Sequence, residues 1–143
     1  MNTLNRKPLT LNDMNALLPG TLPGHMGIVI SAIRERELDA RMAVEPHHLA
    51  PNGYLHAASV VALADTACGL ATYLNLADGA SGFTTIELKS NHLGTARKGH
   101  IECTATAQHI GRSTHVWDAA VTDQDTGRTI TIFRCTQMVL WPS

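Results

Sequence analysis

The segment from residue 57 to residue 76 constrains the fold of this chain more than any other, because it is apolar on nearly every face. Its many alanines favour a helix, and a helix that is apolar all round must be enclosed by protein or by lipid. Asp65, Thr66 and Thr72 interrupt the apolar surface and argue against lipid. The segment therefore predicts a long central helix that is buried inside the fold.

The rest of the chain has the patterns of one short helix and six strands. Thr10 and Asp13 form an acidic variant of the capping box, which predicts a short helix that ends at Pro19-Gly20. Six segments are rich in β-branched residues or alternate with a period of two: residues 26–33, 38–44, 83–93, 100–110, 114–122 and 128–140. Residues 34–36, 111–113 and 123–127 are short enough for hairpins, so the strands that they join should pair antiparallel.

One long helix and six strands can bury both of their apolar surfaces only if the sheet curls around the helix, since no second long helix remains to cover it. This predicts an α+β hotdog fold, in which a six-stranded antiparallel sheet curls around one long central helix. We expect a single domain over residues 25–143, preceded by a segment over residues 1–24 that contains the short helix. A chain of 143 residues can bury such a core without disulfides or a structural metal.

Composition excludes several classes of function. The formal net charge of −1 gives no basic field for nucleic acid or an anionic membrane, so a small-molecule partner is expected. The N-terminal residues lack the apolar core of a signal peptide, and the chain has no uninterrupted apolar run long enough to span a membrane, which together predict a cytoplasmic protein. Cys68, Cys103 and Cys135 are widely spaced and predict free buried thiols, and the eight histidines show no compact metal-ligand motif.

Asp65 is the first candidate for chemistry, because it is a carboxylate among apolar neighbours. An unpaired charge there would be costly, and its pKa would be raised. An alternative interpretation is that the helix begins late, with Asp65 as its N-cap and residues 57–64 as a buried strand, because Asp favours caps over helix interiors. The sequence leaves a functional carboxylate and this structural role equally open.

The segment just before the helix is the second candidate. Asn52 and Gly53 suggest a turn, and His56 follows at the point where the helix is expected to begin. The N–H groups at a helix start suit an anion or a developing oxyanion, and Ala57 and Ala58 leave room for a ligand. Alternatively, His56 bonds a loop carbonyl and Gly53 only satisfies the turn.

These two candidate segments together resemble a family signature. Residues 52–58, Asn-Gly-Tyr-Leu-His-Ala-Ala, and residues 63–67, Leu-Ala-Asp-Thr-Ala, are similar to the N-G-x-x-H-G-G and L-A-D/E patterns of PaaI-type hotdog thioesterases. Residues 85–93 and 111–117 also resemble segments of the 4-hydroxybenzoyl-CoA and enterobactin-pathway proofreading thioesterases. The whole resemblance spans residues 25–140. The chain departs from the family pattern at Ala57 and Ala58, where two glycines are usual, and at Gly69, where a hydroxyl often follows the carboxylate.

The resemblance implies hydrolysis of an acyl-CoA thioester, with an aryl or a short to medium acyl group. Asp65 would attack the thioester or activate water, and the N–H of Ala57 would polarise the carbonyl. His56 would position the thioester or support its loop, and Asn52 and Gly53 would shape the turn. Arg112, Ser113 and Thr114 match a CoA-contacting region, and Lys89, Arg97 and Lys98 are further candidates for phosphate contacts. CoA is part of the substrate, so no cofactor is expected.

The spacing of Ala57 and Asp65 adds an inference that does not depend on the family. On one helix, eight residues correspond to about 12 Å along the axis, so one thioester carbon cannot contact both groups. If both act on one carbonyl, the helix start of one subunit must meet the carboxylate of another. We therefore expect a homodimer as the minimal active unit, and a homotetramer as the complete assembly.

Two other functions remain open at this level. One is a non-catalytic hotdog protein that binds an acyl-CoA or a lipid, because a fold does not fix a function and Ala57 and Ala58 could narrow the site. The other is an acyl-thioester hydratase, which would need His56 and Asp65 to act together across a subunit interface.

Overall fold

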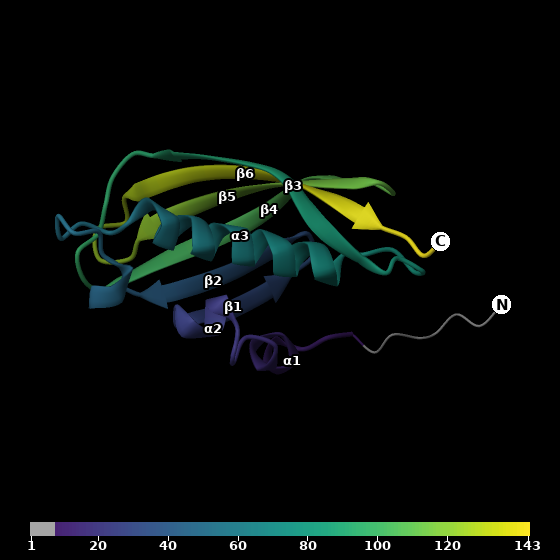
Figure 1. The fold of residues 1–143 in the computed structure, drawn as a ribbon, viewed down its shortest axis with the longest axis horizontal. Coiled ribbons are helices and arrows are strands. Elements are labelled where there is room, and N and C mark those ends of the chain that lie inside the picture. The colour runs from purple at the N-terminus through teal and green to yellow at the C-terminus, as the bar shows by residue number, and fades with distance from the viewer. Residues whose placement is uncertain (1–7) are drawn as a thin grey trace.

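The computed structural model describes residues 8–143, which form one antiparallel sheet, one long helix and short helical turns (Figure 1). In chain order the elements are α1 (Leu11–Ala16), α2 (Leu22–His25), β1 (Ile28–Arg34), β2 (Glu37–Ala43), the 3-10 turn η1 (Pro46–His48), α3 (Ala57–Leu74), β3 (Gly82–His92), β4 (His100–Ile110), β5 (Thr114–Asp123) and β6 (Thr129–Leu140). The strand order in the sheet is β1-β2-β4-β5-β6-β3, and every neighbouring pair is antiparallel.

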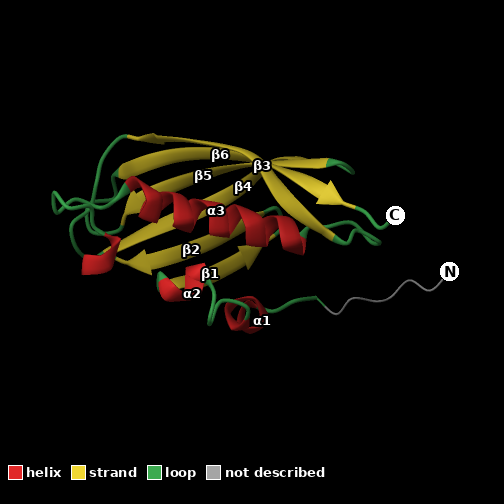
Figure 2. Cartoon of the chain, viewed as in Figure 1, coloured by secondary structure: helices red, strands yellow, loops and turns green. Residues whose placement is uncertain are grey.

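The sheet curls around α3, which lies along its inner face (Figure 2) and contacts β2, β3, β4, β5 and β6. Leu63, Ala64, Ala67 and Cys68 are completely buried between helix and sheet. By length and composition alone α3 could cross a membrane, but here it fills the inside of the sheet. The predicted fold, a six-stranded antiparallel sheet around one long central helix, is confirmed.

Alternation along the strands decides which side chains face α3. In β4, Ile101, Cys103 and Ala105 are buried against the helix side, while the intervening Glu102 and Thr104 lie on the other face. This period of two follows from the pleat of a strand, which sends successive side chains to opposite faces. The core is therefore a single layer between the sheet and α3.

The boundaries of the six strands and of the long helix agree with the predicted ones to within two residues, and β4 agrees at both ends. The first short helix, α1, ends at Ala16, before the predicted end at Pro19-Gly20. The long helix ends at Leu74 and not at residue 76, because the N–H of Asn75 bonds the carbonyl of Thr72 and closes the last turn. A second short helix, α2, lies in the N-terminal region and was not predicted. Met14 and Leu18 from that region belong to the same core as the sheet and α3.

The two edges of the sheet differ in how they are covered. At the β1 edge, the side-chain amide of Asn15 in α1 donates to the carbonyl of Ile30 and accepts from its N–H, both at 2.9 Å. Asn15 thus takes the place of a neighbouring strand. At the opposite edge, β3 is exposed over six consecutive residues, and Ile86 and Leu88 are 53% and 42% exposed. Long edge strands with exposed apolar residues are templates for pairing with another chain.

The Asn15 contact yields the first prediction. Asn15→Ala should lower the free energy of unfolding by about 1–3 kcal/mol, because the N–H and carbonyl of Ile30 lose their partner at a part-buried position. Denaturant unfolding measures the change. Asn12→Ala, on the exposed side of the same short helix, is the matched control and should be close to neutral. Equal effects of the two substitutions would contradict this account of the β1 edge.

Candidate active site

The start of α3 is held in place by His56, which is its N-cap. The ring Nδ1 of His56 accepts the N–H of Ala58 at 2.9 Å, and its carbonyl accepts the N–H groups of Ser59 and Val60. The N–H of His56 and the hydroxyl of Ser59 both donate to the carbonyl of His48, at 3.0 and 2.8 Å. The helix start is therefore tied to η1, and the N–H of Ala57 remains at its exposed end.

Asn52 and Gly53 form a tight turn before this cap. Gly53 has a φ of +83°, a left-handed conformation that favours glycine, and its N–H bonds the carbonyl of Ala50 at 2.9 Å. The side chain of Asn52 accepts the N–H of Tyr54 at 3.1 Å, and the N–H of Ala50 bonds the carbonyl of Tyr54 at 2.7 Å. The closed turn fixes the direction in which the chain enters α3.

Asp65 lies in the third turn of α3, well inside the helix. Because the helix begins at Ala57 with His56 as its cap, the alternative of Asp65 as an N-cap after a buried strand is wrong. Burial raises the pKa of Asp65 above its ordinary value, and its buried Oδ1 has no hydrogen-bond partner among the described residues. A carboxyl group with a raised pKa and an unpaired oxygen in an apolar setting is a candidate for a reacting group.

The thiol of Cys68, one turn after Asp65, does not compete as a nucleophile. A hydrogen bond with Cys135 and burial hold the pKa of Cys68 well above its ordinary value, and the charge of Asp65 adds to this effect. The thiolate is the reactive form of cysteine, so a neutral buried thiol is inert. Cys68, Cys103 and Cys135 are all free and buried, which confirms the prediction made for them.

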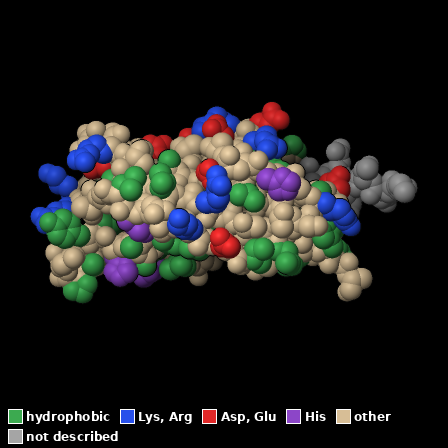
Figure 3. Space-filling view, turned by 90° about the horizontal axis from the view of Figure 1, so that it is seen from above, with side chains coloured by type: hydrophobic (Ala, Val, Ile, Leu, Met, Phe, Trp, Pro, Cys, Tyr) green, Lys and Arg blue, Asp and Glu red, His purple; other side chains and the backbone are tan. Residues whose placement is uncertain are grey.

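The predicted CoA contacts lie in three separate places. Arg97 and Lys98 are in the β3–β4 loop, at the end of the molecule where α3 begins and where Lys and Arg side chains gather at the left of Figure 3. The guanidinium of Arg97 stacks on the ring of Tyr54 at 4.1 Å, which joins this loop to the turn before α3. Arg97 is thus the basic candidate with a direct connection to the helix start.

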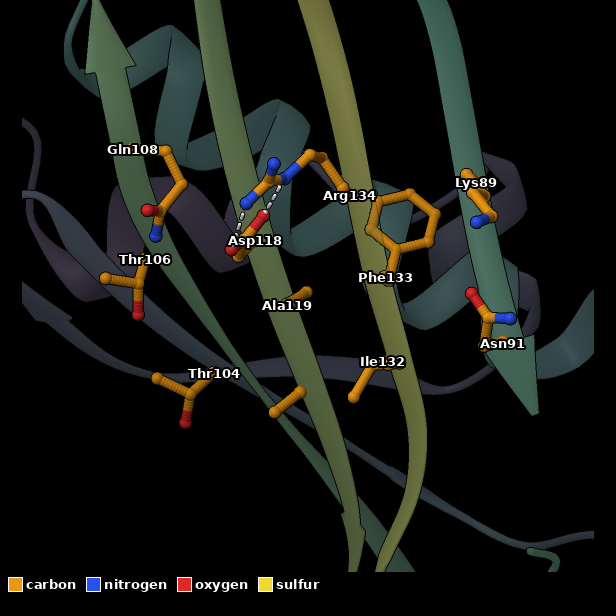
Figure 4. Close-up of a pocket in the computed structure, with 11 residues that line it drawn as sticks. Lys89, Asn91, Thr104, Thr106, Gln108, Asp118, Ala119, Ile132, Phe133 and Arg134 are labelled. Carbon is orange, nitrogen blue, oxygen red and sulfur yellow. Dashed lines mark hydrogen bonds and ion pairs between the residues drawn. The ribbon is translucent and has the colours of Figure 1, made fainter. Parts of the chain in front are cut away.

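The other two groups are distant from that end of the same chain. Arg112, Ser113 and Thr114 lie in and after the β4–β5 hairpin, at the far end of α3, where Arg112 stacks on Trp141 at 4.2 Å. Lys89 lines an open groove on the outer face of the sheet, opposite α3, together with the Asp118–Arg134 ion pair (Figure 4). The sequence-predicted residues therefore do not form one site within a single subunit.

One hydrogen-bonded group at the end of β3 was not predicted from the sequence. His92 contacts the hydroxyl of Ser90 through Nε2 at 3.0 Å and the hydroxyl of Thr131 through Nδ1 at 3.1 Å. The two-residue spacing of Ser90 and His92 on a strand was a usable signal, since it puts both side chains on one face. Thr131 comes from β6 and could not be associated with them from spacing.

A metal centre is not formed by the histidines of residues 8–143. The rings of His25, His47 and His48 are near each other, with centroids 5.8 and 4.1 Å apart. However, no three His, Cys, Asp or Glu side chains in this part of the chain are arranged to hold a metal ion.

Comparison with known proteins agrees with the fold. Residues 52–130 match the family described as the thioesterase superfamily. The structure is similar to that of a thioesterase from Haemophilus influenzae, with a TM-score of 0.88 and 32% identity over 94% of this chain and 92% of the other. It is also similar to a mutant thioesterase from Pseudomonas aeruginosa, with a TM-score of 0.89 and 32% identity over 94% and 96%. The proofreading thioesterase EntH of Cronobacter sakazakii is 30% identical over 88% of this chain and 91% of that protein.

The curled sheet, the central helix and the matched segment define a hotdog-fold thioesterase domain. The chain belongs to the thioesterase superfamily, and its relatives support thioester hydrolysis as its general activity.

The raised pKa of Asp65 predicts a pH dependence of stability. Above the ordinary value of 3.8, the folded protein retains a proton on Asp65 that the unfolded chain releases, so stability falls as the pH rises through the raised pKa. Asp65→Asn lacks this loss of stability. The unfolding free energy of Asp65→Asn minus that of wild type should therefore increase as the pH rises from 3.8 to the raised pKa, and stay constant above it. Denaturant unfolding at several pH values measures it, with the exposed Asp78→Asn as control. A difference that is constant with pH would contradict the burial of this carboxyl.

Proposed function

We propose that this protein hydrolyses an acyl-CoA thioester, with Asp65 as the reacting carboxylate. The observation that carries the proposal is the Oδ1 atom of Asp65, which is buried in an apolar helix without a hydrogen-bond partner in the described chain. The start of the same helix offers the Ala57 N–H, which suits the negative charge that develops on a carbonyl oxygen. Membership of the thioesterase superfamily supports this chemistry.

Two routes are compatible with one carboxylate. As a base, Asp65 would take a proton from water while the water oxygen bonds to the carbonyl carbon; the carbon–sulfur bond then breaks and CoA leaves as the thiol. As a nucleophile, Asp65 would bond to that carbon and the carbon–sulfur bond would break, so that CoA leaves and a mixed anhydride remains. Water would then hydrolyse the anhydride to the free acid and restore the Asp65 carboxylate. In both routes the products are a free acid and CoA, and in both the Ala57 N–H stabilises the oxyanion.

A second subunit completes the site in this proposal. Ala57 and Asp65 belong to one continuous helix, so about 12 Å of helix axis separates them and they cannot act on the same carbonyl. We place the second copy at the exposed β3 edge, because the β1 edge is interrupted at Ile30, where Asn15 already occupies the backbone N–H and carbonyl. Pairing of two β3 strands would continue the sheet across a two-fold axis.

The level of β3 along α3 supports this pairing. The ring of Phe83, at the start of β3, lies 3.5 Å from where a Cβ atom on Gly69 would be. Phe83 and Gly69 therefore have similar positions along the axis of α3. From there β3 runs back toward the start of α3 (Figure 1). The midpoint between Ala57 and Asp65 is Val61, which is about 12 Å before Gly69 at ~1.5 Å per residue.

A distance of about 12 Å along β3 corresponds to between three and four residues at ~3.3 Å per residue. Counted from Phe83, it ends between Ile86 and Glu87. Glu87 is the middle residue of Gly82–His92. Antiparallel pairing of two β3 strands about their centres would therefore bring Ala57 of one subunit level with the partner subunit's Asp65. The middle of β3 and the spacing of the reactive groups both support a two-fold axis near the centre of this strand.

The same dimer accounts for the separation of the CoA candidates. Because the partner would run antiparallel, its β4–β5 hairpin would lie at the end of the dimer where the first subunit carries Arg97 and Lys98. Arg112 and Ser113 of the hairpin and the basic β3–β4 loop would then flank one site from two subunits. Association of two such dimers as a tetramer is a further part of the proposal.

A binding protein without hydrolytic activity is the second candidate. The methyl groups of Ala57 and Ala58 are exposed at the helix start, where they narrow the approach to the N–H. An acyl-CoA that binds without release of thiol would favour this alternative.

Replacement of the carboxylate separates the two candidates. Asp65→Asn should lower thiol release from an acyl-CoA by about 10³-fold or more, because the amide can neither attack the thioester nor take a proton from water. Affinity for CoA itself should change little. The assay covers aromatic, short and long acyl-CoA esters, with Asp78→Asn as a control on an exposed carboxyl. Undiminished turnover in Asp65→Asn would eliminate the proposed mechanism.

A further inference from the structure

Two histidine rings hold the start of α3, and both must carry no proton on Nδ1 to do so. The Nδ1 atom of His56 accepts the N–H of Ala58 at 2.9 Å, and the Nδ1 atom of His48 accepts the N–H of Glu45 at 3.0 Å. In a protonated imidazole both ring nitrogens are donors. Protonation of either ring therefore replaces a hydrogen bond by two N–H groups that face each other.

The two rings are connected through the backbone of His48. Its carbonyl accepts the N–H of His56 at 3.0 Å and the hydroxyl of Ser59 at 2.8 Å. Its N–H donates to the carbonyl of Glu45 at 2.9 Å, so the ring and the backbone of His48 both depend on the position of Glu45. A change at the ring of His48 is therefore transmitted through one carbonyl to the first turn of α3.

The surroundings of the His48 ring oppose its protonation. His48 is 1% exposed, and its Nε2 atom is buried without a hydrogen-bond partner within residues 8–143. Burial, and after it the nearby ring of His47, lower the pKa of His48 below its ordinary value of 6.5. Glu45 and the carbonyls of Met26 and Ala43 act in the opposite direction, with a smaller effect.

Two further rings extend this group to α2. The ring centroid of His47 lies 4.1 Å from that of His48 and 5.8 Å from that of His25, which is the last residue of α2. His25 and His47 are both exposed. Histidine gains its positive charge between about pH 8 and about pH 5, and like charges on neighbouring rings repel. Acid therefore weakens the packing of α2 against η1 as well as the hydrogen bonds at the start of α3.

We propose that the contact between η1 and the start of α3 is a pH-sensitive switch, which opens in acid and releases the Ala57 N–H from its fixed position. The sign follows from proton binding at His48. The closed contact holds fewer protons than the open one, so its stability is complete above the ordinary pKa of 6.5 and decreases as the pH falls below it. Opening of the contact does not depend on the proposed function, whereas its effect on thiol release rests on it.

Amide hydrogen exchange at the start of α3 tests the switch in the wild-type protein. After correction for the intrinsic exchange rate at each pH, protection of the His56 and Ala58 N–H groups should fall about tenfold between about pH 7.5 and about pH 5.5. Amides in the middle of β4, such as that of Cys103, should keep their protection. Constant protection at His56 and Ala58, or a parallel loss in β4, would overturn the proposal.

Asparagine variants identify the rings that are responsible. The side-chain oxygen of Asn can accept the backbone N–H at any pH, and Asn is a preferred N-cap residue. His48→Asn should remove the pH dependence of protection at His56, and His56→Asn should remove it at Ala58. His109→Asn, an exposed histidine of β4, is the matched control and should behave as wild type. A double variant of His48 and His56 that still opens like wild type would overturn the assignment.

Thiol release from an acyl-CoA, measured at the same pH values, connects the switch to the proposed function. His48→Asn should retain a larger fraction of its neutral-pH activity in acid than wild type does, because titration of Asp65 affects both proteins alike. Equal fractions would overturn the control of activity by the switch. A wild-type protein that releases no thiol at any pH would overturn the proposed function, while hydrogen exchange would still decide on the switch.

Discussion

The structure depends on the need to enclose a helix that is too apolar for water. A single curled sheet encloses α3 on one side, and this arrangement keeps Asp65 in an apolar setting where burial raises its pKa. Within residues 8–143, no hydrogen-bond partner of Asp65 Oδ1 compensates for the cost of desolvating this carboxyl group. The unpaired oxygen is therefore a feature that stability does not favour, and in the proposed function the hydrolysis of a thioester uses it.

The enclosure of α3 also creates an asymmetry between the sheet edges. At the β1 edge, Asn15 occupies the backbone N–H and carbonyl of Ile30, whereas β3 has β6 as its one neighbouring strand within residues 8–143. Because β3 runs beside the helix face that carries Asp65 and Gly69, whatever pairs with this edge also approaches the proposed site. In the proposed dimer, this geometry would link assembly to catalysis.

Much of the fold could be predicted from sequence, because alternation in residues 100–110 and the apolar character of the central helix are local patterns. The position of Asp65 in the helix could not be predicted, because its neighbours are compatible with both an N-cap and a helix interior. The cap at His56, whose ring nitrogen accepts the N–H of Ala58, shows that the helix begins at Ala57 and that Asp65 is in its interior. Contacts between segments that are distant in the sequence could not be predicted either. The stacking of Arg97 on Tyr54, the Ser90–His92–Thr131 group and the pairing of β3 with β6 all depend on how the sheet closes.

The central claim is that one site uses the Ala57 N–H of one subunit and the Asp65 carboxylate of the other, and subunit complementation tests it most directly. Ala57→Pro removes the N–H at a position where helices tolerate proline, and Asp65→Asn removes the carboxylate. Each variant alone should be nearly inactive. Co-expressed in equal amounts, they should recover about a quarter of wild-type specific activity, because half of the dimers are mixed and each mixed dimer has one intact site. A mixture as inactive as its two parents would contradict a site shared between subunits.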